Sequence, residues 1–149
     1  MPRSTEERRL GLRPADPVLI VDDDRGCADL LARGLRRWQI AAACRYDGAT
    51  ALEAICATDP PVVLLDIGLP DIPGTEVAAE ALARGLNPCL ILMSGYDERI
   101  LGACDTGIAF FRVLHKPLPI RFLAPFVGEC VSRVRAARVR AAAARRSAV

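Results

Sequence analysis

Residues 62–74 read VVLLDIGLPDIPG, and this stretch decides the fold class. Four consecutive apolar residues, 62–65, have the length of a strand, and the run ends on a carboxylate, Asp66. Pro70 and Gly74 follow, and they mark a turn before the next helical segment. A short unbroken apolar run between polar turns is typical of a strand buried on both faces, as in a parallel sheet.

The same pattern recurs on both sides of this stretch. Four further apolar runs of strand length occupy residues 17–21, 40–44, 89–93 and 111–114. Helical periodicity lies near residues 26–38, 48–58, 75–84 and 98–106, and a last helix starts near 120. Strands that alternate with helices at this spacing indicate βα units, whose right-handed crossovers place helices on both faces of the sheet. We therefore predict a doubly wound α/β fold with a parallel sheet.

Composition indicates one soluble domain without a membrane segment. The chain has 149 residues, of which 52% are hydrophobic and 26% charged. No apolar run approaches the roughly 18 residues that span a bilayer, and residues 1–17 contain no apolar segment typical of a secretory signal. We expect a cytoplasmic protein. The cysteines are scattered singly and there is one histidine, which argues against a zinc site and against disulfides.

Charge divides the chain into three parts. Residues 1–17 form an N-terminal extension rich in Arg, Glu and Pro. Residues 18–126 form the domain and carry a net charge of −4, whereas residues 127–149 carry +5 and are rich in Ala and Arg. We predict that this third part is the end of the last helix followed by a basic helical tail. An acidic domain is not the footprint of a nucleic-acid-binding protein, so no specific nucleic-acid partner is expected.

Polar residues suited to one chemistry follow four of the five predicted strands. Asp22, Asp23 and Asp24 follow the first, and Asp66, Ser94 and Lys116 follow the third, fourth and fifth. Ligands of an open parallel sheet bind beyond the carboxyl ends of its strands, so these groups should meet at one edge. Clustered carboxylates need a cation, and Mg²⁺ fits, because it leaves positions for phosphate oxygens. A carboxylate beside Mg²⁺ can attack a phosphoryl group.

Four segments of the chain, VLIVDDD, VVLLDIGLPDIPG, LILMSG and HKP, resemble the signature segments of response-regulator receiver domains. The resemblance covers roughly residues 17–126, in the family's order and near its spacing. It implies a flavodoxin-like fold with a five-stranded parallel sheet of order 2-1-3-4-5 and five helices. The resemblance also implies that the chain is a phospho-acceptor switch in a two-component system and not an enzyme. Such a domain catalyses only its own phosphorylation and dephosphorylation.

The resemblance assigns the phosphorylation and metal sites by matching position. Asp66 is expected to accept a phosphoryl group from a histidine kinase or a histidine phosphotransfer protein. The expected Mg²⁺ ligands are Asp23, Asp66 and the backbone carbonyl of Gly68, and Asp22 is expected to reach the metal through water. Three structural roles are also implied: Asp24 as a helix N-cap, Gly74 as the turn after the third strand, and Pro117 in a cis peptide.

The resemblance further implies how the phosphoryl group is sensed and how long it lasts. Ser94 and Lys116 are the expected phosphate-sensing hydroxyl and lysine. Gly68 and Tyr96 occupy the positions that shape water access to the phosphoryl group, and so its lifetime. Many receivers carry an aromatic residue three positions before the lysine, but this chain has Val113 there. The aromatic part of the usual switch is therefore not expected here.

Three other functions share some of these sequence features. A haloacid-dehalogenase-type phosphatase also uses an aspartate after its first strand, but it needs an acidic pair after the lysine, where this chain has only Glu129. A pseudo-receiver that serves only for binding would not need the complete Asp, Ser and Lys set. A receiver separated from a hybrid kinase is less favoured than a free-standing regulator. Because only 23 residues follow residue 126, we expect no DNA-binding output domain.

The last helix is longer than a receiver requires. Its apolar positions form a heptad seam at Leu123, Val127, Cys130, Val134, Ala137, Ala141 and Ala144. The first half of this seam should pack on the sheet, and the second should project past the domain and support a weak homodimer. Three further expectations concern Trp38 and Tyr46, which should cover the core near the second strand, and His115, which should be structural or at the surface.

Overall fold

One parallel sheet forms the centre of the molecule. The computed structural model describes residues 17–95 and 112–148. In this part of the chain the sheet has five strands in the order β2-β1-β3-β4-β5, all pairs parallel. Their bounds are β1 Val18–Val21, β2 Ala42–Arg45, β3 Val62–Asp66, β4 Cys89–Ser94 and β5 Arg112–His115. The predicted fold class and the strand order 2-1-3-4-5 are confirmed.

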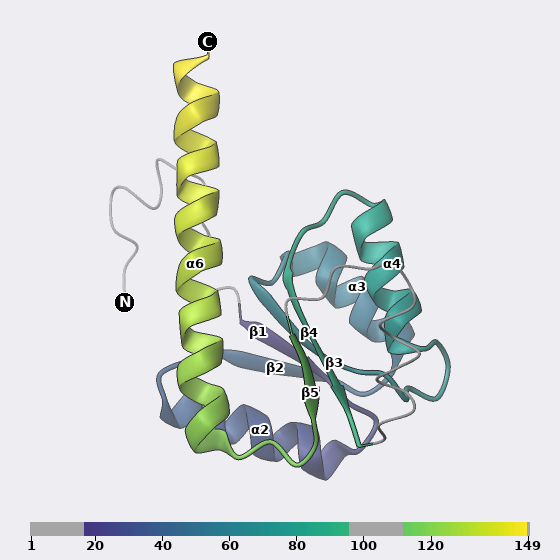
Figure 1. Ribbon diagram of the computed structural model, residues 1–149. Helices are drawn as coiled ribbons and strands as arrows, with labels where there is room; N and C mark the ends of the chain where they lie inside the picture. Colours follow the sequence, from purple (N-terminus) through teal and green to yellow (C-terminus); the bar gives the residue numbers. More distant parts are fainter. Residues whose placement is uncertain (1–16, 96–111, 149) are drawn as a thin grey trace.

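Helices cover both faces of this sheet (Figure 1). Helices α2 (Arg25–Arg37) and α6 (Ile120–Ser147) pack on one face, and α3 (Gly48–Thr58) and α4 (Gly74–Ala83) pack on the other. Alternate strand residues enter the two cores, so Leu64 and Ile91 face α2 and α6, whereas Leu65 and Leu92 face α3 and α4. Because both faces of the three central strands are buried, β1, β3 and β4 read as nearly unbroken apolar runs.

The second strand starts later than the apolar run at residues 40–44 suggests. Gln39 has a positive φ of 61°, and the amide of Ile40 donates to the carbonyl of Leu35 in α2. These residues therefore complete the end of α2, and strand pairing begins at Ala42. Trp38 is the C-cap of α2 and is 48% exposed, so the expectation that it covers the core was wrong.

Several predictions fall on residues outside the described part of the chain. They are the helix near 98–106, Tyr96, and all but the last residue of the extension at 1–17. In the residues that are described, no helix is both long and apolar enough to cross a membrane.

Helix α6 extends well beyond the sheet (Figure 1). Its first half packs on the sheet through Leu123, Val127 and Cys130, as the heptad pattern predicted. The second half is also attached, because the guanidinium of Arg138 donates to the carbonyl oxygen (2.9 Å) and carboxylate (3.1 Å) of Asp59. The helix therefore leaves the domain about one turn later than the expected point, Val134. Beyond this contact the predicted seam is exposed, at Ala141 and Ala144.

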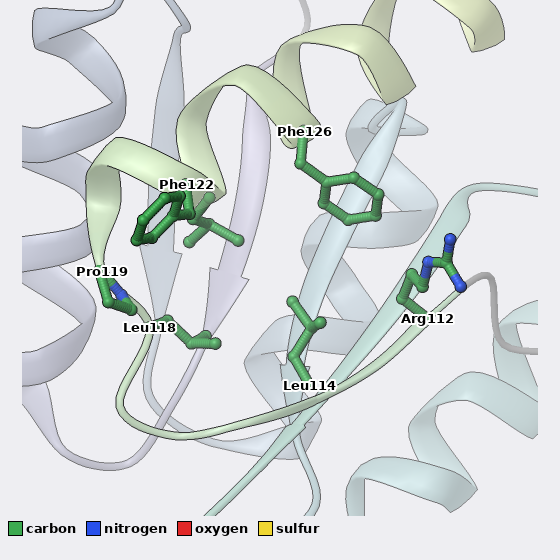
Figure 2. Close-up of a pocket in the computed structure, with 7 residues that line it drawn as sticks. Arg112, Leu114, Leu118, Pro119, Phe122 and Phe126 are labelled. Atoms are coloured by element: carbon green, nitrogen blue, oxygen red, sulfur yellow. The ribbon is translucent and has the colours of Figure 1, made fainter.

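An apolar pocket of about 280 Å³ lies between β5 and the start of α6 (Figure 2). Side chains of β5, of the connection to α6 and of the first turns of α6 line it: Arg112, Leu114, Leu118, Pro119, Phe122, Leu123 and Phe126. Phe122 is 67% exposed, although it is one of the largest apolar side chains of the chain. This corner of the domain thus presents apolar surface to its surroundings.

Candidate functional site

The carboxyl ends of the strands bring the predicted site residues to one edge of the sheet. Asp66 is the last residue of β3 and lies in register with Met93 of β4, which immediately precedes Ser94. The Lys116 amide donates to the carbonyl of Ser94 (2.8 Å), which continues the ladder past β5. Asp22 follows β1 directly, and its amide donates to the carbonyl of Arg45 in β2 (3.1 Å).

Three carboxylates and one ammonium group meet at this edge. Oxygens of Asp22, Asp23 and Asp66 all lie within 4.8 Å of one another. Lys116 Nζ lies 2.6 Å from Oδ2 of Asp22 and 2.9 Å from Oδ2 of Asp66, so it bridges two of the three. Asp22 is fully buried and Asp66 is 8% exposed, whereas Asp23 is exposed. The site thus opens to solvent on the side of Asp23.

Local backbone structure fixes the acidic residues after β1. Asp24 caps α2, because its carboxylate accepts a hydrogen bond from the amide of Cys27 (3.1 Å), as the sequence predicted. Its own amide donates to Oδ1 of Asp22 (3.0 Å). Asp22 therefore turns inward toward Lys116, while Asp23 lies between two residues whose conformations are both fixed.

The chain after β3 folds back closely onto Asp66. The Gly68 amide donates to Oδ1 of Asp66 (2.9 Å), and the Gly74 amide donates to the carbonyl of Ile67 (3.1 Å). A Cβ atom on Gly74 would overlap the backbone carbonyl of Asp66, so only glycine fits at this position. Gly74 thus takes the predicted role in the turn. The role of the Gly68 carbonyl as a metal ligand remains a prediction.

Burial and charge act in opposite directions on Asp22 and Lys116. Burial raises the pKa of Asp22, and hydrogen bonds from Lys116 and from the Asp24 amide offset only part of this effect. Burial also disfavours the charge of Lys116, but hydrogen bonds to Asp22 and Asp66 outweigh it and raise the lysine pKa. Lys116 therefore stays charged and balances carboxylates that would otherwise repel one another.

The remaining predicted residues lie on or just after β4 and β5. Ser94 is buried (1% exposed) at the end of β4, and the Lys116–Pro117 peptide is cis, as expected. His115 is exposed at the end of β5, in line with a surface residue. Val113 is half-buried and packs with the core on the α3 and α4 side of the sheet.

The donor set fits a small divalent cation. Mg²⁺ takes oxygen ligands at about 2.1 Å, so two ligand atoms on one ion lie at most about 4.2 Å apart. The separation of up to 4.8 Å among the carboxylate oxygens is close to this limit, and small side-chain rotations bring them within it. No histidine or cysteine belongs to the cluster, which favours Mg²⁺ over softer metals.

Two features of the site were not anticipated from the sequence. Lys116 contacts Asp22 as well as Asp66, and Asp71 caps α3, with its carboxylate 2.7 Å from the Gly48 amide and 2.9 Å from the Ala49 amide. Both contacts join residues far apart in the sequence. The only available signal for Asp71 was its place within the motif at 62–74.

Comparisons with known proteins agree with this geometry. A family model, the response regulator receiver domain, matches residues 18–124. The transcriptional regulatory protein CutR of Streptomyces coelicolor is 35% identical over 119 residues, which are 80% of this chain and 52% of CutR. The chain therefore spans about half the length of the curated relatives that it matches.

Solved structures of receiver domains are similar over most of the chain. A CheY-like receiver domain protein from Methanospirillum hungatei has a TM-score of 0.70 at 25% identity, with 80% of this chain and 95% of that chain covered. The response regulator TrrA of Thermotoga maritima, in complex with Mg²⁺–BeF, has a TM-score of 0.68 at 25% identity, with 76% and 97% covered. Since the strand order, the motifs and the family match agree, this chain belongs to the response regulator receiver domain family.

Proposed function

We propose that Asp66 accepts a phosphoryl group from a phosphohistidine on a histidine kinase or a histidine phosphotransfer protein, and that the domain then switches its binding to a partner. One observation carries this proposal: the Asp66 carboxylate lies in a cluster with Asp22 and Asp23, and Lys116 lies 2.9 Å from it. The Asp66 carboxylate supplies the nucleophile. Lys116 supplies the positive charge that phosphoryl transfer requires, and the neighbouring carboxylates can bind a cation that adds to it.

In the proposed reaction a carboxylate oxygen of Asp66 attacks the phosphorus atom of the donor. A bond forms between that oxygen and phosphorus, the bond from phosphorus to the donor imidazole nitrogen breaks, and the imidazole leaves. Lys116 neutralises charge on the transferred group, and the Ser94 hydroxyl donates a hydrogen bond to it. The product is an acyl phosphate on Asp66, and its hydrolysis resets the domain. No other reaction is proposed for this domain.

We propose Mg²⁺ as the cofactor, held by Asp23, Asp66 and the carbonyl of Gly68, with Asp22 bound through water. When bound, Mg²⁺ neutralises negative charge on the phosphoryl oxygens and on Asp66. The exposed side chain of Asp23 lies where an ion from solvent would enter. The TrrA structure, a complex with Mg²⁺–BeF, supports the same assignment for this chain.

Labelling by acetyl phosphate tests the proposal. With Mg²⁺ present, the unchanged chain should gain one phosphoryl group, measured by intact mass spectrometry, and Asp66→Asn should abolish the gain. Asp47→Asn is the matched control, because Asp47 caps α3 and is not a member of the acidic cluster, and Asn is an equally good cap. Undiminished labelling of Asp66→Asn would refute the assignment. Asp23→Ala should raise the Mg²⁺ concentration that half-maximal labelling requires.

Turnover of a phosphomonoester separates this function from a phosphatase. A phosphatase of the haloacid-dehalogenase type needs acids after Lys116, and Glu129 is instead exposed on α6 in a pair with Arg133 (2.7 Å). We expect no steady release of phosphate from p-nitrophenyl phosphate. Sustained release that Asp66→Asn abolishes would favour the phosphatase.

We further propose a weak homodimer in the cytoplasm, with no specific nucleic-acid partner. The exposed ring of Phe122, the pocket beside it and the projecting end of α6 support self-association. Sedimentation should show a dimer that dissociates more readily when residues 134–149 are removed. An equal mass at every concentration, with and without these residues, would contradict this proposal.

A further inference from the structure

The amino end of α3 is capped by two carboxylates from different parts of the chain. The first amides of a helix have no partner within it, so they need acceptors elsewhere. Asp47, the N-cap, accepts from the Thr50 amide at 2.8 Å. Asp71 accepts from the two preceding amides, those of Gly48 at 2.7 Å and Ala49 at 2.9 Å. Asp47 is local to the helix, whereas Asp71 belongs to the loop that follows β3.

Asp71 lies in the middle of that loop, residues 67–73. At the start of the loop, the Gly68 amide donates a hydrogen bond to the Asp66 carboxylate. Just past its end, Gly74 packs against the Asp66 carbonyl. The middle of the loop is attached to α3 by Asp71. The contact is close, because a Cβ atom on Gly48 would lie 2.9 Å from Cβ of Ile72. The loop that carries Gly68 is thus held at three points.

We propose that Asp71 is a positioning residue for the metal site: it sets the loop against α3 and so holds the Gly68 carbonyl in place to bind Mg²⁺. This inference rests on the proposed Mg²⁺ site. Removal of the Asp71 carboxylate removes the hydrogen bonds that hold the middle of the loop to α3 and leaves the packing of Ile72 against Gly48. The Gly68 carbonyl is then less well ordered before the ion binds, so the affinity for Mg²⁺ falls. The lowered pKa of Asp71, caused by hydrogen bonds from the Gly48 and Ala49 amides, agrees with this attachment.

The coupling between the two sites is reciprocal. If the position of the loop favours the ion, the bound ion must favour the position of the loop and thus the hydrogen bonds from Asp71 to α3. Mg²⁺ should therefore slow hydrogen exchange at the Gly48 and Ala49 amides. The Thr50 amide donates to Asp47 instead and serves as an internal reference.

Isothermal titration of the full chain with MgCl₂ tests the inference. We expect Asp71→Ala to weaken Mg²⁺ binding roughly threefold to tenfold, which is less than the loss typical when a group bonded directly to a metal ligand is removed. Asp71→Asn keeps one acceptor and should give an intermediate affinity. Asp47→Ala is the matched control, because it removes a carboxylate cap from the same helix without touching the loop.

Each outcome separates the alternatives. A loss of affinity in Asp71→Ala but not in Asp47→Ala, together with loss of the Mg²⁺-dependent protection at Gly48 and Ala49, supports the inference. Equal losses in both variants would overturn it, because the cap would then act only through the stability of α3. An unchanged affinity in Asp71→Ala would overturn it as well. If the unchanged chain failed to bind Mg²⁺, the proposed function itself would fail.

Discussion

Gly74 lies against the backbone carbonyl of Asp66 with no space for a side chain between them. The first residue of α4 therefore packs directly on the last residue of β3, and the loop between them has to turn sharply. Asp66, the proposed phospho-acceptor, is thereby held by backbone atoms, which do not change rotamer.

Gly74→Ala should disturb both the fold and the acceptor. The added methyl group must displace backbone, and overpacking of this kind costs about 1–3 kcal/mol. We expect a lower free energy of unfolding in urea and slower labelling by acetyl phosphate. Gly128→Ala is the control, because a Cβ there lies 3.5 Å from Ile40, an ordinary contact, and alanine favours the helix. Equal stabilities for the two variants would contradict this account.

Lys116→Met should destabilise the metal-free protein and make it more dependent on Mg²⁺. Loss of the cation leaves the buried Asp22 facing Asp66 without compensation, a change that costs on the order of 3 kcal/mol. Because the ion supplies the missing charge, the rise in Tm between EDTA and MgCl₂ should be larger for the variant than for the unchanged chain. Equal rises in Tm for the two chains would show that Lys116 does not supply the charge that Mg²⁺ would otherwise provide.

On the alkaline side, the effect of pH on this ion pair follows from the pKa of Lys116. The pKa of Lys116 is raised in the folded state. Its charge therefore contributes fully to the free energy of unfolding at any pH below the ordinary lysine pKa of 10.5, as long as the carboxylates are ionised. The contribution is lost only as the pH rises through the raised value, and measurements near neutral pH register all of it. Arg133→Met is the control, because its pair with Glu129 is exposed and should contribute at most about 1 kcal/mol.

The strands and the acidic cluster could be predicted because they depend on local patterns. An unbroken apolar run that ends on a carboxylate identifies β3 and Asp66 together, and parallel topology then brings Asp22 and Lys116 to the same edge. The turn that delays β2 could not be predicted, because the left-handed residue there is Gln39 and not glycine or asparagine. The contacts of Asp71 with α3 and of Lys116 with Asp22 depend on tertiary packing alone.

The cysteines should differ sharply in reactivity. Burial raises the pKa of Cys89 to about 12 and also raises that of Cys130, so both remain protonated thiols at neutral pH. Cys56 is exposed. We expect a disulfide reagent to modify Cys56 in the folded protein much faster than the other two, as mapped by peptide mass spectrometry. Rapid labelling of Cys89 before unfolding would contradict the prediction, and labelling in guanidinium provides the control.

Truncation should show where α6 stops contributing to the domain. A chain that ends at Val139 keeps the bonds from Arg138 to Asp59, and its Tm should equal that of the unchanged chain. A chain that ends at Arg133 loses these bonds and should be less stable by about 1 kcal/mol. Arg138→Ala in the unchanged chain should reproduce this loss. An equal Tm for all three chains would show that the contact does not stabilise the fold.

The course of α6 determines where a label can be attached without covering Asp66. The helix begins just past Lys116, beside the proposed phosphorylation site, and reaches Asp59 and Pro60 just before the start of β3, at the amino ends of the strands. From Arg138 to Ser147 it continues for about 14 Å at the usual rise per residue. A fluorophore or fusion attached near Ser147 therefore stands at the far pole of the domain, where it does not obstruct a phosphate donor docking at Asp66.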